Sequence, residues 1–556
     1  MSSKELESEK DVGVDAEVQV ATHYVPEYNE TDIDDVAIDV HTHLKDGVRR
    51  QLRQRHAQMM ALAGAIGTGL FLGSGKSIQH AGPAGALLSY ITIGTVVWSM
   101  TYSLGEVICY APISGGYIHY VERFIHPSAG FALGYVQWYS SVINLPAEMI
   151  SAVLIIGFWT EMTNAKIAGF LVLLSVLTVM INLFGVRWFG ESEFFFSMIK
   201  ILLIIGLIIG GLAVDLGGGP DHERIGFRYW RHPGAFAAYL EPGAKGKFLG
   251  WFYTLVQATY SFSGVETLAI TAGELQNPRL NAAKATRKLF WRIVMFYILG
   301  VLIAGMLVAY DDPDLLRSTG TAAQSPFVIA FTRAGVKGLP SVINAAVLTS
   351  AWSAANTGVY TSSRMMYGMA LRGQAPRIFA KTTAAGLPVV SVVFSGLFTA
   401  LSFMTLSKTA NTVLNWLTNL TSIAALINWA MICLAFIRWK AAMDAQGRDR
   451  SATKYIYLKW QPWVAYYGLI WCCVITLFNG FYVFIKGNWD VSDFIISYLN
   501  LPIFGGLFLG HWLYTGRKGF FKAKEIDLVS NIPGPEVDFD PDPPTTALGR
   551  FWNWLL

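Results

Sequence analysis

The sequence predicts an all-α polytopic membrane protein with twelve transmembrane helices, of which the first and the sixth are broken. Hydrophobic residues make up 53% of the 556 residues and charged residues only 14%. Apolar runs of about 20 residues, the length that crosses a bilayer as a helix, recur along the chain. Two of these runs contain a glycine-rich break, and paired breaks in two halves of a chain are typical of a transporter's substrate site.

The first break is Gly67-Thr68-Gly69, inside the apolar stretch 59–75. Glycine costs a helix about 1 kcal/mol relative to alanine, and unwound backbone in a membrane is tolerated only beside protein or a water-filled cavity. The second break, 261–266, has the sequence SFSGVE. Because Gly69 and Gly73 also form a GxxxG pattern, close helix packing stays open as the alternative to a binding site.

Clusters of arginine and lysine lie next to several of the spans expected from hydropathy, all on the same side of the membrane. These clusters precede the first span and follow the sixth, eighth, tenth and twelfth, so the positive-inside rule predicts that both tails are cytoplasmic and that the loop 215–247 is extracellular. The twelve expected spans are 59–80, 84–110, 129–159, 165–185, 194–214, 248–274, 289–310, 338–363, 388–407, 412–437, 463–486 and 494–515.

Charge composition divides the chain into a membrane domain and two tails. Residues 1–46 contain 13 acidic and three basic residues, and residues 525–556 contain six acidic and one basic residue. Acidic segments poor in aromatic residues are typical of disorder. We therefore expect a disordered acidic cytoplasmic tail over 1–48, a transmembrane domain over 49–520 and a cytoplasmic tail over 521–556. The start lacks the pattern of a cleaved signal peptide, so the first membrane helix is expected to direct insertion.

The two breaks together predict a site for an α-amino acid. Unwinding at Gly67–Gly69 leaves free N–H groups at the start of a half-helix, where the helix dipole favours a carboxylate. Free carbonyl groups around Tyr260–Ser263 suit an ammonium group.

The deepest ionisable residues of the expected spans are Glu148, Lys200 and Glu266. Charges inside a membrane are costly enough to indicate function by default. Structural alternatives remain open, because Glu148 follows the kink-forming Pro146 and the side chain of Lys200 is long enough to reach the inner face.

Three further polar residues are weaker candidates. Asn356 is expected either to line the cavity or to form a hydrogen bond between helices. Thr418 and Ser422 share a helix face and would either contact the substrate or pack against a neighbouring helix. The chain contains no P-loop, no dinucleotide-binding context and no nucleophile or zinc motif, so ATP-driven transport, nucleic-acid binding and enzymatic activity are not expected. No cofactor is expected, apart from the proton as coupling ion.

Several motifs occur in order and resemble those of fungal amino-acid permeases, the yeast amino acid transporter family of the amino acid-polyamine-organocation superfamily. The resemblance covers roughly residues 50–520 and implies two inverted five-helix repeats plus two further helices, as in neurotransmitter-sodium symporters. It also implies proton-coupled amino-acid uptake at the plasma membrane. The motifs are RHAQMMALAGAIGTGLFLGSG from Arg55, SLGE from Ser103, PISGGY from Pro112, GELQNPRLNAAKA from Gly273 and SAANTGVYTSSRMMYGMALRGQAP from Ser353.

The resemblance also assigns roles to single residues. It implies that the carboxylate is held by Ile66, Gly67, Thr68 and Gly69, and that the amine is held and the pocket gated by Tyr260, Phe262, Ser263 and Gly264. Glu266 occupies the family's G-x-E position, and Lys200 resembles a lysine that replaces a sodium ion in proton-coupled relatives. The chain departs from the family at Val265, where threonine is frequent, and before Arg438, where a histidine is often found.

Two stretches, LPAE at 145–148 and VAYDDP at 308–313, resemble the proline and neutral amino-acid permeases most. We find no arginine or lysine away from the ends of the first, third, sixth, eighth and tenth spans, and an anionic side chain would need such a partner. Neutral amino acids with proline foremost are therefore expected first, cationic ones second and dicarboxylic ones third. A broad-range permease and a transporter-like amino-acid sensor remain alternatives.

The expected partners are the amino-acid substrate and membrane lipid. The resemblance also implies contact between a ubiquitin-ligase adaptor and the cytoplasmic tails, where Lys4, Lys10 and Lys45 are the candidate acceptors. The tails are too short for a recognisable folded module, which favours a transporter over a sensor.

Overall fold

The structure is a computed structural model that describes residues 68–112, 116–184, 186–266, 278–316, 325–383, 386–450, 456–517, 519–530, 532 and 546. Within these ranges the regular secondary structure is entirely helical. The main helices are α3 (Thr68–Tyr110), α4 (Gly116–Phe124), α5 (Pro127–Ile156), α6 (Asn164–Leu183), α7 (Val186–Asp215), α8 (Gly243–Phe262), α10 (Pro278–Leu307), α12 (Pro326–Arg333), α13 (Leu339–Leu371), α14 (Val389–Leu397), α15 (Ala410–Ala445), α16 (Trp463–Phe478), α17 (Val491–Tyr498) and α18 (Asn500–Tyr514).

Each of the twelve expected spans overlaps one of these helices or an adjoining pair. Among the described residues, seven helices are long and apolar enough to cross a membrane, or eight if α17 and α18, which meet at 46°, form one bent span. An all-helical polytopic membrane protein is therefore confirmed over the described residues. The number twelve and the inverted repeat remain predictions.

The described part of the first expected span, 68–80, and the second expected span, 84–110, both lie in α3, which bends at Gly82. Gly82 has φ 73°, and a Cβ at this position would lie 2.6 Å from the backbone nitrogen of Ala237. Pro83 follows directly, and proline has no N–H to continue the helix. The backbone of the 235–237 segment hydrogen-bonds at the bend, since Ala84 N–H donates to Ala235 O over 2.9 Å and Ala237 N–H donates to Ala81 O over 3.0 Å. Only glycine fits this close approach at a positive φ.

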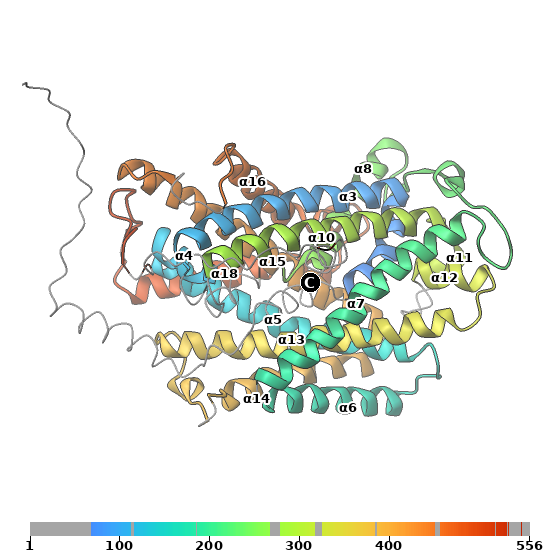
Figure 1. The fold of residues 1–556 in the computed structure, drawn as a ribbon, viewed down its shortest axis with the longest axis horizontal. Helices are drawn as coiled ribbons and strands as arrows, with labels where there is room; N and C mark the ends of the chain where they lie inside the picture. Colours follow the sequence, from blue (N-terminus) through green and yellow to red (C-terminus); the bar gives the residue numbers. More distant parts are fainter. Residues whose placement is uncertain are drawn as a thin grey trace, which may run out of the picture. The chain divides into compact units, whose positions relative to one another are not determined.

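Two groups of three helices form the core around the candidate site. Helix α3 packs lengthwise against α8 and α10, and α5 packs against α13 and α15 (Figure 1). Helix α6 by contrast exposes a row of large apolar side chains that includes Val172, Leu173, Val176 and Met180. An apolar surface of this kind is expected where a helix faces lipid.

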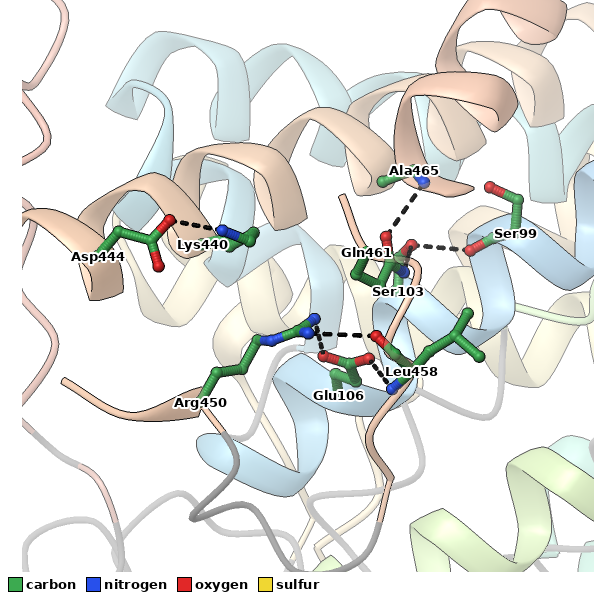
Figure 2. A network of polar contacts seen from close by, with 9 residues as sticks. All are labelled: Ser99, Ser103, Glu106, Lys440, Asp444, Arg450, Leu458, Gln461 and Ala465. Atoms are coloured by element: carbon green, nitrogen blue, oxygen red, sulfur yellow. Dashed lines mark hydrogen bonds and ion pairs between the residues drawn. The ribbon is translucent and has the colours of Figure 1, made fainter. Parts of the chain in front are cut away.

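Glu106 of the SLGE motif joins α3 to the segment before α16. Its side chain is fully buried and forms an ion pair of 3.0 Å with Arg450. Its second oxygen accepts a hydrogen bond of 2.9 Å from the N–H of Leu458 (Figure 2). Next to this pair, Gln461 donates to the Ser103 hydroxyl over 2.9 Å. These contacts form a buried polar clamp, defined here as Ser103, Glu106, Arg450, Leu458 and Gln461.

The C-terminal segment 519–530 packs on the ends of α3, α4 and α15. Asp527 pairs with Arg123 of α4 over 3.1 Å, and Tyr110 at the end of α3 donates to the carbonyl of Leu528 over 2.6 Å. Ile526 and Leu528 are buried. Acidic composition predicts disorder from residue 525 onwards, but these two apolar side chains and the ion pair order residues 525–530.

Candidate functional site

The two helices that carry the predicted breaks, α3 and α8, meet at the carboxylate of Glu148. Thr68, the first described residue of α3, donates its hydroxyl hydrogen to Glu148 Oε2 over 3.0 Å. Tyr260 of α8 donates its hydroxyl hydrogen to Glu148 Oε1 over 3.2 Å and lies 3.1 Å from Asn144 Oδ1. Glu148 itself is 3% exposed. Residues from the first, third and sixth expected spans are thus brought to one carboxylate.

Gly69 allows α3 and α8 to approach each other closely. A Cβ on Gly69 would lie 2.8 Å from the Cα of Ser261, which is closer than the Cβ atoms of real residues come to a non-bonded heavy atom. Two tyrosines hold Ser261 in place: Tyr297 donates to its carbonyl over 2.7 Å, and Tyr90 lies 2.9 Å from its hydroxyl. Gly69 therefore belongs to the contact between the two breaks. Ile66 and Gly67, which were predicted to bind the carboxylate with it, lie outside the described residues.

Helix α8 ends at Phe262, within the second predicted break. Ser263 is extended, with φ −62° and ψ 146°, and Gly264 has φ 94°. The Ser263 hydroxyl donates to the carbonyl of Tyr260 over 2.8 Å, which satisfies one of the carbonyls left free at the helix end. Phe262 is buried, and its ring packs edge-on against Tyr297 with centroids 4.6 Å apart.

The amino acid permease family matches this chain over residues 56–523. The chain belongs to this family. It is 41% identical over 529 residues to a proline-specific permease of Emericella nidulans, a match that covers 93% of this chain and 94% of the relative. It is 38% identical to a proline-specific permease of Saccharomyces cerevisiae, over 92% of this chain and 83% of that protein. A dicarboxylic amino acid permease of the same yeast is 37% identical, over 87% of this chain and 80% of its own length. Members of this family are transporters, and the permease is accordingly not an enzyme.

A buried charge cluster lies beside Glu148 in the permease. Lys200 of α7 is 1% exposed and interacts electrostatically with Glu193 and Glu148. Glu193 is fully buried, and Ser353 of α13 donates its hydroxyl hydrogen to it. The cluster joins two acids to one base, in accord with the rule that buried charges are paired.

Glu193 is not among the residues predicted from the sequence. It lies seven residues before Lys200 on α7, which places both side chains on the same helix face two turns apart. That spacing is the signal that could have identified it. Asn144, the second partner of Tyr260, was also missed, because a single amide carries no charge signal.

Glu266, the other predicted coupling residue, has a different set of neighbours. It is 3% exposed and accepts a hydrogen bond of 3.1 Å from the indole N–H of Trp429 on α15. The described hydrogen bond thus connects Glu266 to α15, whereas Glu148 receives its hydrogen bonds from α3 and α8.

Asn356 and Thr418 form no described hydrogen bond with Glu148, although the side chain of Asn356 lies near Glu193. Asn356 is buried on α13, and its Oδ1 accepts a hydrogen bond of 2.6 Å from Asn182 of α6, the interhelical contact considered as its alternative role. Thr418 and Ser422 line a cavity of about 360 Å³. The cavity is lined by residues of α8, α15 and α17 and of the segments near Tyr239 and Asn479.

Proposed function

We propose that this permease imports amino acids across the plasma membrane by proton-coupled secondary transport with alternating access, with proline and other small neutral amino acids as the favoured substrates. The observation that carries this proposal is the convergence of Thr68 and Tyr260 on Glu148. Two helices that carry the predicted breaks and a buried acid meet at one point, and they provide donors for a carboxylate and an acceptor for an amine. Both termini are proposed to be cytoplasmic, on the strength of the basic clusters.

In this mechanism Glu148 accepts the hydrogen bond of Thr68 at the break predicted at Gly67–Gly69 while the site is empty. The half-helix start predicted at this break favours negative charge, so an ionised Glu148 competes there with the carboxylate of a substrate. Adding a proton to Glu148 removes that repulsion and frees the hydroxyl hydrogens of Thr68 and Tyr260 for the substrate. A proton and an amino acid therefore enter together.

Lys200 and Glu193 are proposed to hold the coupling charge. The cluster of Lys200, Glu193 and Glu148 has a net charge of −1 when all three side chains are ionised, and one added proton makes it neutral. A conformational change around a site buried in the membrane costs less free energy when the site is neutral than when it carries a net charge. Glu266 is proposed to transmit the change, because it lies in the break after α8 and is joined to α15 through Trp429.

The preference for proline is proposed from the relatives and from the lining of the junction. The relatives at 41% and 38% identity carry the description proline-specific. At the junction, Phe262 and Tyr260 are buried aromatic side chains and provide an apolar surface for a compact neutral side chain.

The test is uptake of radiolabelled proline by cells that express the permease and lack their own proline uptake. We expect saturable accumulation that increases as the external pH falls and collapses when a protonophore dissipates the gradient. A panel of unlabelled amino acids then ranks the substrates. Accumulation that is indifferent to pH and to the protonophore would contradict proton coupling, and signalling without uptake would point to a sensor.

A further inference from the structure

Lys76 is a cation that the proposed mechanism leaves unused. It lies on α3 eight residues after Thr68, which is about 12 Å along a helix that rises 1.5 Å per residue. Its side chain is half-buried, and its Nζ donates a hydrogen bond of 2.5 Å to Asn415 Oδ1 on α15. Within the described ranges no carboxylate lies at ion-pair distance from it, although the exposed Lys245 and the half-buried Lys440 have such partners.

Lys76 belongs to a line of α3 residues that leads from the junction at Glu148 to the cavity of about 360 Å³. Gly69 contacts Ser261 at the junction. One turn on, a Cβ at Gly73 would lie 2.7 Å from the amide nitrogen of Gln257, so that amide covers Gly73. Gln257 and Asn415 both line the cavity. Lys76 therefore contacts one amide of the cavity wall, that of Asn415, and lies one turn beyond Gly73, which the amide of Gln257 covers.

A half-buried ammonium group whose described side-chain partner is an amide is favourable for binding an anion. Removing a charge from water is costly unless it is paired, and a neutral amide compensates that cost less well than a carboxylate does. Asp493 is a charged residue that lines the cavity. Its negative charge acts on three tyrosines, Tyr239, Tyr253 and Tyr482, and it forms no described ion pair with Lys76.

We propose that Lys76, with Asn415 and Gln257, forms an outer carboxylate-binding site that holds an amino acid in the cavity before it reaches Glu148. This inference rests on the proposed transport function and adds a second station to it. The carboxylate is either the α-carboxylate that every amino acid carries or the side-chain carboxylate of a dicarboxylic one.

The site also bears on the ranking of substrates. Dicarboxylic amino acids were placed third because no arginine or lysine was found away from the ends of the pocket-forming spans. Lys76, which contacts Asn415 beside the cavity, is such a cation. Within the first expected span, 59–80, Lys76 lies near one end by sequence, but α3 continues past it to the bend at Gly82. A cation that is partly shielded from water attracts an anion more strongly than a cation at a solvated helix end, because the effective dielectric constant around it is lower.

The experiment compares Lys76→Met and Lys76→Arg with the wild-type chain, measuring the KM for proline and the inhibition constant of glutamate. Because a hydrogen bond to a charged group is among the stronger ones, we expect Lys76→Met to raise the affected constant by about tenfold and Lys76→Arg to restore most of it. The matched control is Lys166→Met, which removes an exposed lysine on α6 and is expected to change neither constant.

The two sources of the carboxylate give different results. If the α-carboxylate binds at Lys76, both the KM for proline and the inhibition constant of glutamate rise; if only the side-chain carboxylate binds there, only the glutamate constant rises. Unchanged constants, or a change in maximal rate alone, would overturn the outer site while leaving the transport function intact. Absence of any amino-acid uptake by the wild-type protein would instead overturn the transport function and the outer site together.

Discussion

Glu148 receives hydrogen bonds from two helices and lies within the field of a buried lysine, so its charge state and the local geometry depend on each other. Thr68 and Tyr260 each donate to a different carboxylate oxygen. Hydrogen bonds to a charged group contribute about 1.5–3 kcal/mol, enough to shift an equilibrium between two arrangements by more than tenfold. A change in the charge of this single side chain is therefore sufficient to alter how α3 and α8 pack together.

Replacing Lys200 by methionine tests the coupling cluster. Methionine preserves most of the side-chain volume and removes the charge, which leaves Glu193 and Glu148 without their buried base. We expect proline accumulation to fall to the equilibrating level while the protein still reaches the cell surface. Lys166→Met, on the exposed part of α6, serves as the control for the loss of a lysine. Concentrative uptake with an unchanged pH dependence in Lys200→Met would contradict the assignment.

Replacing Glu266 by glutamine tests the link between the second break and α15. Glutamine still accepts the hydrogen bond from Trp429 but carries no charge, so folding should be preserved. We expect uncoupled or abolished proton-driven uptake, measured at matched surface levels. If wild-type accumulation persists across external pH, Glu266 has a structural role only.

At the scale of elements, the contact between α3 and α8 depends on one missing side chain. In Gly69→Ala the new methyl group would meet the backbone of Ser261 at 2.8 Å, so α3 or α8 has to move. We expect uptake to fall by at least about tenfold, since small displacements at a binding site have effects of this order.

Gly206→Ala on α7 is the matched control, because a Cβ there has no atom within 4 Å. Alanine favours a helix over glycine by about 1 kcal/mol, so this variant should retain uptake and at least wild-type thermal stability. Equal uptake by the two alanine variants would show that the close approach at Gly69 is not required.

The buried clamp at Glu106 makes a prediction about stability. Removing one partner of a buried ion pair costs about 3–5 kcal/mol because the other charge is left unpaired. Glu106→Ala should therefore lower the melting temperature of the purified permease strongly. In the same view, Lys440 and Asp444 form an exposed pair (Figure 2), and breaking an exposed pair costs at most about 1 kcal/mol.

Asp444→Ala is accordingly the control for the clamp, and its melting temperature should stay close to the wild-type value. Similar melting temperatures for Glu106→Ala and Asp444→Ala would show that the ion pair with Arg450 does not support the fold.

At the scale of the whole molecule, the helical class could be predicted from the sequence. Three of its candidate residues, Thr68, Glu148 and Tyr260, are the ones that the structure brings together. Apolar length and glycine breaks are local signals, and they located α3, α5 and α8 and the end of α8 at Phe262. Partners such as Asn144 and Asn415 depend on which helix faces which, and no local pattern encodes that. The docking of residues 525–530 was missed because the acidic composition was assessed over the whole segment 525–556, in which the two buried residues Ile526 and Leu528 carry little weight.

The C-terminal segment 519–530 connects the ends of three helices, and its attachment depends on charge. Partial burial opposes the ionisation of Asp527, but N–H groups of Ser530 and Val529 and the guanidinium of Arg123 outweigh it and hold the pKa of Asp527 below its usual range. Because the pKa is lower in the docked state, ionised Asp527 stabilises docking at any pH above the ordinary carboxylate value. This contribution is lost only as the pH falls through the lowered pKa.

Asp527→Asn should therefore release the segment at neutral pH, since it removes the charge that pairs with Arg123. Hydrogen exchange of 519–530, corrected for the intrinsic effect of pH, should be slow in the wild-type protein at both pH 7 and pH 5 and fast in Asp527→Asn. Glu525→Gln is the control, because Glu525 accepts its hydrogen bond from Lys522 within the same segment rather than binding α4. Equally slow exchange in Asp527→Asn would mean that buried Ile526 and Leu528 are sufficient to hold the segment without the ion pair.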